Sequence, residues 1–130
     1  MNIYALSSGR GPSGIAIVRI SGKDTLKVCK NLTKLKKINC NEVNFCKFYD
    51  PKTDKIIDPE ALLLWFPGPN SYTGDDLAEF QVHGSNAVIN AVLKALSEQD
   101  NCRLAEPGEF TKTAFHCLLY TSPSPRDGLL

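Results

Sequence analysis

The chain has 130 residues, which is enough for one domain with a hydrophobic core and too short for two. Apolar residues make up 42% of it and charged residues 22%, a balance typical of ordinary globular proteins. The net charge of +1 creates no overall field that would attract polyanions, so composition alone does not favour nucleic-acid binding. No apolar run approaches the ~18–20 residues that a membrane span needs, and no leader precedes the first strand candidate, which predicts a cytoplasmic protein.

The first half of the sequence predicts two strands and a helix. Residues 2–6 form a strand candidate, and the turn-forming residues over 7–14 predict a loop after it. The nearly continuous apolar run over 15–20 is typical of a strand that is covered on both faces in the middle of a sheet. The spacing over 24–35 predicts a helix with Asp24 as its N-cap. The apolar face of this helix would consist of Val28, Leu32 and Leu35.

The second half predicts three more strands and a longer helix. Residues 43–49 and 77–83 alternate between polar and apolar types, and 61–66 is a continuous apolar run. A broad apolar stripe over 86–97 predicts a helix that Gly84-Ser85 opens. Three segments separate these elements: a turn over 50–54, a stiff loop over 67–71 with two prolines, and Glu106-Pro107-Gly108. A short helix is predicted to start after them, near Glu109.

Strands and helices interleave, yet two pairs of strands are joined by turns rather than by helices. This organisation predicts an α+β fold, with one domain over residues 1–116 built on a mixed sheet with about three helices. Residues 117–130 lack hydrophobic periodicity and place two prolines among serine and threonine. We expect them to be a tail that does not pack on the domain, either an adaptor-like read-through or a disordered segment.

The cysteines and the adjacent acids carry weak signals. The five cysteines form no CxxC pair and have no histidine at metal-ligand spacing, which favours reduced thiols over a disulfide or a zinc site. Asp75 and Asp76 are more consistent with polarising a loop than with an acid/base pair, and we identify no catalytic residue. The cysteines are Cys29, Cys40, Cys46, Cys102 and Cys117.

Two positions are candidates for a binding site. Arg19 lies inside the apolar run 15–20, where a guanidinium needs a buried partner; this is either an internal salt bridge or a ligand. Along 77–83, Glu79, Gln81 and His83 share one face of the strand. That face is either solvated or the floor of a polar pocket, where a carboxylate could accept two parallel hydrogen bonds from an amidine-like edge, such as the ring N–H and amino group of a pterin.

Glycines and lysines form two further clusters. The glycines over 9–14 match neither the GxxxxGK[ST] nor the GxGxxG spacing, which argues against a nucleotide phosphate loop. Six lysines surround the first predicted helix, where they form either a solvated helix face or a tRNA contact. They are Lys23, Lys27, Lys30, Lys34, Lys36 and Lys37.

Three sequence motifs follow one another along residues 2–115, in an order and at a spacing that are shared with a known family. They are IYALSSGRG over 3–11 with GIAIVRISG over 14–22, WFPGPNSYTGDD over 65–76 with Glu79 and His83-Gly84, and RLAEPGEFT over 103–111 with Ala114-Phe115. Together they resemble the N-terminal domain of the MnmE (TrmE) family of tRNA-modification GTPases.

The resemblance implies a five-stranded α+β domain akin to the tetrahydrofolate-binding part of aminomethyltransferases. Such a domain binds 5-formyl- or 5,10-methylene-tetrahydrofolate and forms a homodimer. Full-length members add a GTPase domain that uses GTP, Mg²⁺ and K⁺, so this chain alone is expected to be inactive. With the flavoprotein MnmG (GidA) they modify C5 of the wobble uridine of certain tRNAs, and the folate supplies the one-carbon unit. For a eukaryotic source the expected location is the mitochondrial matrix.

The family's folate contacts carry over to Arg19 and Glu79. A third family contact is a lysine shortly after an Ala-Phe pair; here Ala114-Phe115 is followed by His116 and Cys117, so that lysine is absent. Two alternatives stay open. One is a stand-alone folate-dependent protein of the aminomethyltransferase type, and the other is a dimerisation module that has lost folate binding.

Overall fold

A computed structural model describes residues 1–7, 14–69, 71 and 73–111. The predictions for the tail 117–130, for most of the loop 7–14 and for the positions after Phe115 lie outside these residues. The elements follow the order β1 (Asn2–Leu6), β2 (Ile15–Ser21), α1 (Thr25–Thr33), β3 (Val43–Tyr49), β4 (Ile56–Phe66), β5 (Leu77–His83), α2 (Asn86–Ser97) and β6 (Cys102–Leu104). A further helical turn begins at Glu109, as predicted.

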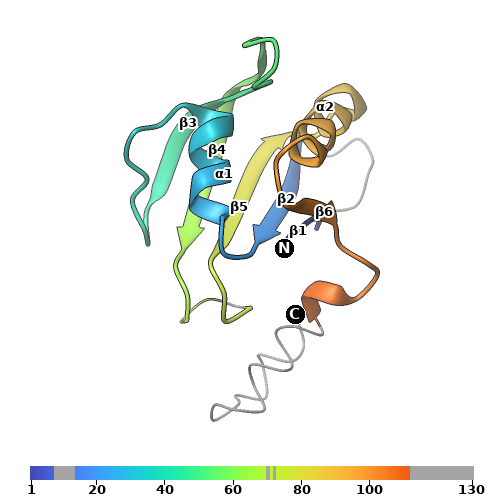
Figure 1. Ribbon diagram of the computed structural model, residues 1–130. Helices are drawn as coiled ribbons and strands as arrows, with labels where there is room; N and C mark the ends of the chain where they lie inside the picture. The colour runs from blue at the N-terminus through green and yellow to red at the C-terminus, as the bar shows by residue number, and fades with distance from the viewer. Residues whose placement is uncertain (8–13, 70, 72, 112–130) are drawn as a thin grey trace.

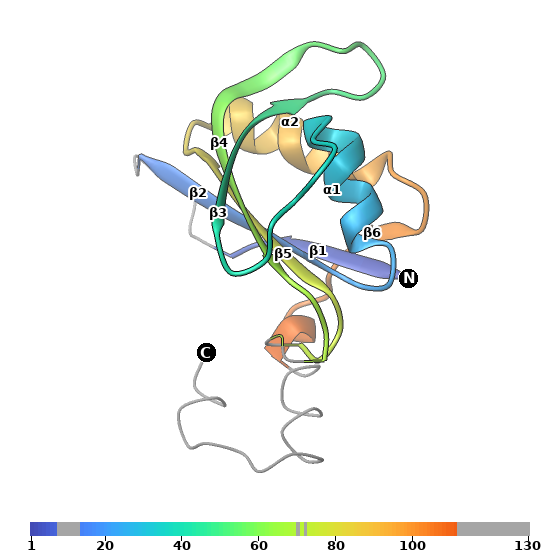
Figure 2. The ribbon, with the colours of Figure 1, turned by 90° about the vertical axis from the view of Figure 1, so that its left-hand side faces the viewer.

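The six strands form one mixed sheet in the order β3-β4-β5-β2-β1-β6. Every neighbouring pair is antiparallel except β1 and β6, which run parallel. Both helices pack on the same face of the sheet, and neither covers the other face (Figures 1 and 2). This arrangement confirms the predicted α+β fold, with β6 as a strand beyond the five expected.

The ends of several elements differ from the sequence prediction for local reasons. β4 begins five residues early, and its pairing with β3 shifts register between Phe48 and Tyr49. α1 ends at Thr33 because Lys34 adopts a left-handed conformation, with φ 60°, and donates its N–H to the carbonyl of Lys30. The strands 43–49 and 77–83 and the helix 86–97 have the predicted bounds.

The two helix starts are held differently. Ser85 caps α2, because its hydroxyl accepts a hydrogen bond from the Val88 N–H at 3.3 Å. Asp24 does not cap α1 with its side chain, which corrects the prediction. It is bound instead to Asn2 of β1, which accepts the Asp24 N–H at 2.9 Å and donates to its carboxylate at 3.2 Å. The start of α1 is therefore fastened to the sheet.

The core lies between the helices and the sheet. Alternate residues of β2 and β5 supply its centre, and the Phe80 ring packs edge-on against Phe48 with 5.0 Å between centroids. Because both helices cover one face, β2 is covered on that face only. The prediction of a strand covered on both faces is wrong: Ile15 is 54% exposed, and Arg19 is half-buried on the open face.

Candidate functional site

Arg19 and Glu79 form an ion pair on the open face of the sheet. The antiparallel register of β2 and β5 places them directly opposite each other, and Arg19 Nε donates to Glu79 Oε1 at 3.1 Å. Gln81 donates to the other carboxylate oxygen at 3.0 Å. The Arg19 side chain is 37% exposed and that of Glu79 13%, so the carboxylate is the more buried partner. The internal salt bridge is one of the two arrangements that the sequence left open for Arg19.

A pocket of about 560 Å³ lies beside this ion pair, between the end of β1 and the segment after β6. Arg19 is among its lining residues, and Glu79 is not. The other lining residues are Ala5, Leu6, Ser7 and the eight residues over 104–111. The lining therefore combines apolar side chains with a few hydrogen-bonding groups, as small-molecule sites do.

The wall made by 104–111 is held by a bidentate ion pair. Arg103 donates from its two terminal nitrogens to the two carboxylate oxygens of Glu109, at 2.8 and 2.5 Å. The bond to Glu109 raises the pKa of the Arg103 guanidinium. The Glu106 N–H donates to the same carboxylate at 2.9 Å, and the Ala105 N–H donates to the carbonyl of Tyr4 in β1 at 2.8 Å. These contacts give the wall a fixed shape against the sheet.

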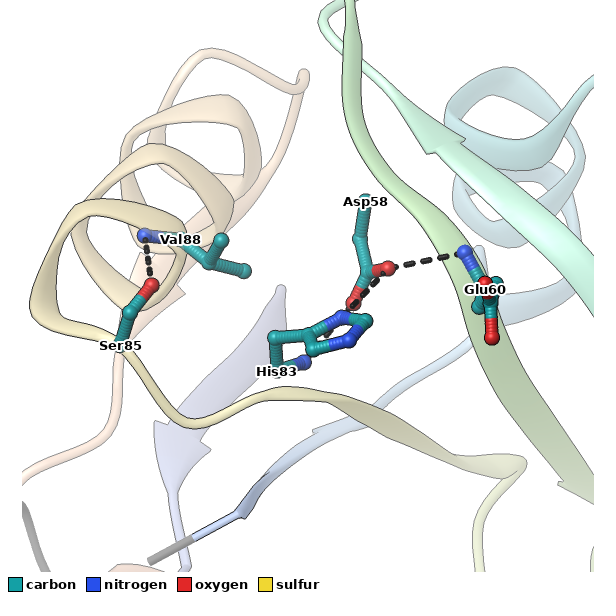
Figure 3. A network of polar contacts seen from close by, with 5 residues as sticks. All are labelled: Asp58, Glu60, His83, Ser85 and Val88. Carbon is teal, nitrogen blue, oxygen red and sulfur yellow. Dashed lines mark hydrogen bonds and ion pairs between the residues drawn. The ribbon is translucent and has the colours of Figure 1, made fainter. Parts of the chain in front are cut away.

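The polar row along β5 ends at a second cluster, shown in Figure 3. Asp58 of β4 is wholly buried and accepts three hydrogen bonds: from the Glu60 N–H at 2.9 Å, the His83 N–H at 2.8 Å and His83 Nδ1 at 2.9 Å. The His83 side chain is 55% exposed, and it lines a hollow of about 200 Å³ with Glu60 and Gln81. His83 lies four positions after Glu79, roughly 13 Å along the strand, and the hollow that His83 and Gln81 line does not include Glu79.

Asp58 is the residue that sequence reasoning missed. An available signal was the acidic segment Asp58-Pro59-Glu60, immediately before the apolar run 61–66. A carboxylate in that position must be exposed or fully hydrogen-bonded, because its burial without partners is costly. Whether Asp58 is exposed or buried with hydrogen bonds depends on β5, which supplies two of its three donors.

The loop between β4 and β5 is braced by Asp76. Its carboxylate accepts the Gly68 N–H at 2.9 Å, and its carbonyl accepts the Ser21 hydroxyl at 2.9 Å. Gly68 approaches the backbone so closely that an added Cβ would lie 2.8 Å from the Gly74 carbonyl. Asp76 therefore fixes the shape of this loop, which agrees with a structural role for the acidic pair. The two ends of the loop lie in contact with each other, at Gly68 and at Gly74–Asp76.

The thiols and the metal-ligating residues provide no further site within the part of the chain that the structure describes. Burial raises the pKa of the Cys29 thiol above its ordinary value and that of Cys46 to about 11, which disfavours the reactive thiolate. Cys29, Cys40, Cys46 and Cys102 are free, and among the described residues no three His, Cys, Asp or Glu side chains could hold a metal ion. None of the described helices is long and apolar enough to cross a membrane.

Comparison with known proteins identifies the family. Residues 2–117 match the family model described as the GTP-binding protein TrmE N-terminus. The chain belongs to the TrmE N-terminal domain family. The tRNA modification GTPase MnmE of Pelagibacter ubique is 56% identical over 115 residues, covering 88% of this chain and 26% of that protein.

Two eukaryotic relatives match the same TrmE N-terminal region. The mitochondrial tRNA modification GTPase gtpbp3 of Dictyostelium discoideum is 43% identical over 119 residues, covering 87% of this chain and 23% of the relative. The human mitochondrial 5-taurinomethyluridine-[tRNA] synthase subunit GTPB3 is 44% identical over 114 residues, covering 87% and 23%. The chain thus spans about a quarter of the length of the curated relatives it matches.

Proposed function

We propose that this domain binds a reduced folate, 5-formyl- or 5,10-methylene-tetrahydrofolate, and dimerises as the N-terminal part of a tRNA-modification GTPase. The observation that carries the folate proposal is the Arg19–Glu79 pair, whose arginine lines the pocket walled by 104–111. In the whole protein we expect GTP, Mg²⁺ and K⁺ to act in a separate domain. We also expect a partnership with an MnmG-type flavoprotein and with tRNA, in the cytoplasm or the mitochondrial matrix.

The size and lining of the pocket fit a folate. A volume of about 560 Å³ lies within the range of pockets that take drug-sized ligands. Leu6, Leu104 and Phe110 offer apolar surface to a heterocycle, and Arg19 offers a cation to an anionic group. Among the described residues Arg19 hydrogen-bonds only through Nε, so its two terminal nitrogens have no partner there. The bound folate would supply a one-carbon unit.

Glu79 fits the pterin edge as an acceptor. Each of its carboxylate oxygens receives one hydrogen bond within the domain, from Arg19 and from Gln81. An ionised carboxylate has about four acceptor positions, so two remain for a ring N–H and an amino group. Because Glu79 lies behind Arg19 rather than in the pocket lining, a pterin would reach it by displacing the guanidinium or by lying along it.

A titration tests this assignment. We expect Glu79→Gln to weaken binding of 5-formyl-tetrahydrofolate by roughly 30- to 150-fold, because the amide cannot make a charge-assisted bidentate contact. Glu60→Gln is the matched control, since Glu60 is an exposed acid at the other hollow of the same face. Calorimetry of the native chain and both variants measures the affinities. Equal affinities for the native chain and Glu79→Gln would refute the pterin contact.

Extension of the chain distinguishes the dimerisation-only alternative. A version in which the family's lysine-bearing continuation follows Phe115 is titrated with the same folate. Binding by the extended chain alone would mean that the present chain has an incomplete site. Absence of binding in both would support the alternative of a dimerisation module that does not bind folate.

The open face of the sheet supports self-association. Phe45 is 79% exposed and Val43 47%, and the register of β3 and β4 pairs them with half-buried Leu62 and Leu64. Residues that pair across two antiparallel strands share a face, so these four form one apolar patch. A second copy that covers this patch around a two-fold axis would remove it from water.

Sedimentation velocity tests the dimer. We expect the native chain to dimerise at high micromolar concentration and Phe45→Ser to shift it toward monomer. Ile56→Ser is the control, because Ile56 is another exposed apolar residue, at 48%, but pairs with Tyr49 at the far end of β3. A native chain that stays monomeric with folate present, or equal effects of both variants, would contradict the proposal.

We place GTP binding outside this chain. The 130 residues contain no GxxxxGK[ST] segment, whose backbone amides and lysine cradle the β- and γ-phosphates. Calorimetric titration should give no saturable GTP binding at sub-millimolar affinity. Saturable binding would overturn this expectation.

A further inference from the structure

The lysines around α1 form a concentrated positive surface on an otherwise acidic chain. Six of the 15 basic residues and one of the 14 acidic residues lie within 23–37. That segment therefore carries a net charge of +5, and the rest of the chain −4. The near-neutral total conceals this separation of charge. We call Lys23, Lys27, Lys30, Lys34, Lys36 and Lys37 the lysine face.

The fold exposes these lysines together. α1 buries Thr25, Val28, Cys29, Leu32 and Thr33 against the sheet, whereas every lysine of the lysine face is exposed. Lys27 and Lys30 are three residues apart on the outer side of α1, and Lys34 follows directly as the residue that ends the helix. α1 lies on the helix-covered face of the sheet (Figure 2), whereas Arg19, which lines the pocket, lies on the open face.

The acids near α1 neutralise little of this charge. Asp54 pairs with Lys34 at 3.0 Å, and Glu98 pairs with Lys52, which lies outside the lysine face. Asp24 is hydrogen-bonded to Asn2, although it shares a small hollow with Lys27 and Asp100. Within the described residues, no salt bridge involves the other lysines of the lysine face. The cations least compensated by neighbours are therefore Lys23, Lys30, Lys36 and Lys37.

We propose that the lysine face binds the phosphodiester backbone of a folded RNA, which for this domain would be the tRNA substrate. Flexible ammonium groups with no fixed acceptor suit phosphates along a strand, because contact releases condensed counterions without requiring a particular base. The proposal rests on the proposed function only for the identity of the RNA. Its site lies on the other side of the sheet from the folate pocket, so the two ligands do not compete.

Salt-dependent RNA binding tests the proposal on the full chain without folate or GTP. The probe is a fluorescently labelled, unmodified tRNA, and anisotropy is measured from 50 to 200 mM KCl. We expect Lys30→Gln with Lys37→Gln to weaken binding roughly tenfold at 50 mM and to lower the slope of log K against log salt by about 1.5. The matched control is Lys47→Gln with Lys55→Gln, which removes the same charge from exposed positions outside the lysine face.

The outcomes separate this inference from the folate proposal. Equal weakening by both double variants would mean that only net charge matters, which would overturn the lysine face as a site. Displacement of the tRNA by poly-glutamate of equal charge would assign the face to acidic proteins instead. A chain that binds folate but shows no salt-dependent tRNA binding would refute this inference and leave the folate site intact. Normal tRNA binding without folate binding would do the reverse.

Discussion

Replacing Asp58 with asparagine keeps the shape of the side chain and removes one acceptor from a buried cluster. The carboxylate accepts from Glu60 N–H and His83 Nδ1 through one oxygen and from His83 N–H through the other. Asparagine has a single oxygen, and its NH₂ group can only donate. If that oxygen keeps the first two partners, the NH₂ faces the His83 N–H, and a buried donor loses its acceptor.

The size of the loss follows from this count. Leaving the part-buried His83 N–H without an acceptor costs about 1–3 kcal/mol, and the bonds that remain lose the assistance of the negative charge. Relief of the cost of burying a carboxylate offsets part of this. We expect Asp58→Asn to lower the free energy of unfolding by about 2–3 kcal/mol, which is roughly a 30- to 150-fold change in the unfolding equilibrium.

Urea unfolding of the full chain measures this loss, with His83→Ala as the control. The histidine variant removes only the ring contact of a side chain that is 55% exposed, and it retains the buried backbone N–H bond to Asp58. We expect it to cost about 1 kcal/mol or less. An Asp58→Asn protein within 0.5 kcal/mol of the native chain, or no less stable than His83→Ala, would refute the reasoning.

Three further predictions address other parts of the domain. Gly22→Ala should prevent stable folding or lower the free energy of unfolding by more than about 2 kcal/mol. The reason is that φ of Gly22 is +148° and the new Cβ would lie 2.2 Å from the Asn2 side-chain oxygen. A melting scan that matches that of the native chain would contradict this. Alkylation mapped by mass spectrometry at pH 8 should label exposed Cys40 well before Cys46, whose pKa burial raises to about 11. Stability should fall as pH rises from about 9 towards 11, because the unfolded thiol ionises first. Arg103→Ala should change the melting temperature by only a few degrees, because it removes a partly exposed ion pair with Glu109. It should loosen the pocket wall, which limited proteolysis would detect as faster cleavage after residue 104. Unchanged cleavage would mean that this ion pair does not hold the wall.

Much of the architecture could be predicted because local patterns are strong. Alternation over 77–83 put Glu79, Gln81 and His83 on one face, and the residues on the opposite face, Ala78, Phe80 and Val82, are buried in the core. The three-residue strand β6 could not be predicted, because its burial pattern has no alternation and it exists only through pairing with β1. The prediction that Asp24 caps α1 is wrong for a related reason, because Asn2, a residue distant in sequence, binds the Asp24 carboxylate.

The sequence by itself determined the α+β class, the family and the two candidate residues, because periodicity, turn residues and motifs are properties of neighbouring positions. Only the tertiary structure decided what those residues touch. The β2–β5 register made Glu79 the partner of Arg19, and the packing of both helices on one face left that pair on the opposite face. Burial of Asp58 likewise needed donors from β5. Strand register and layer packing join residues far apart in the chain, so no local pattern specifies them.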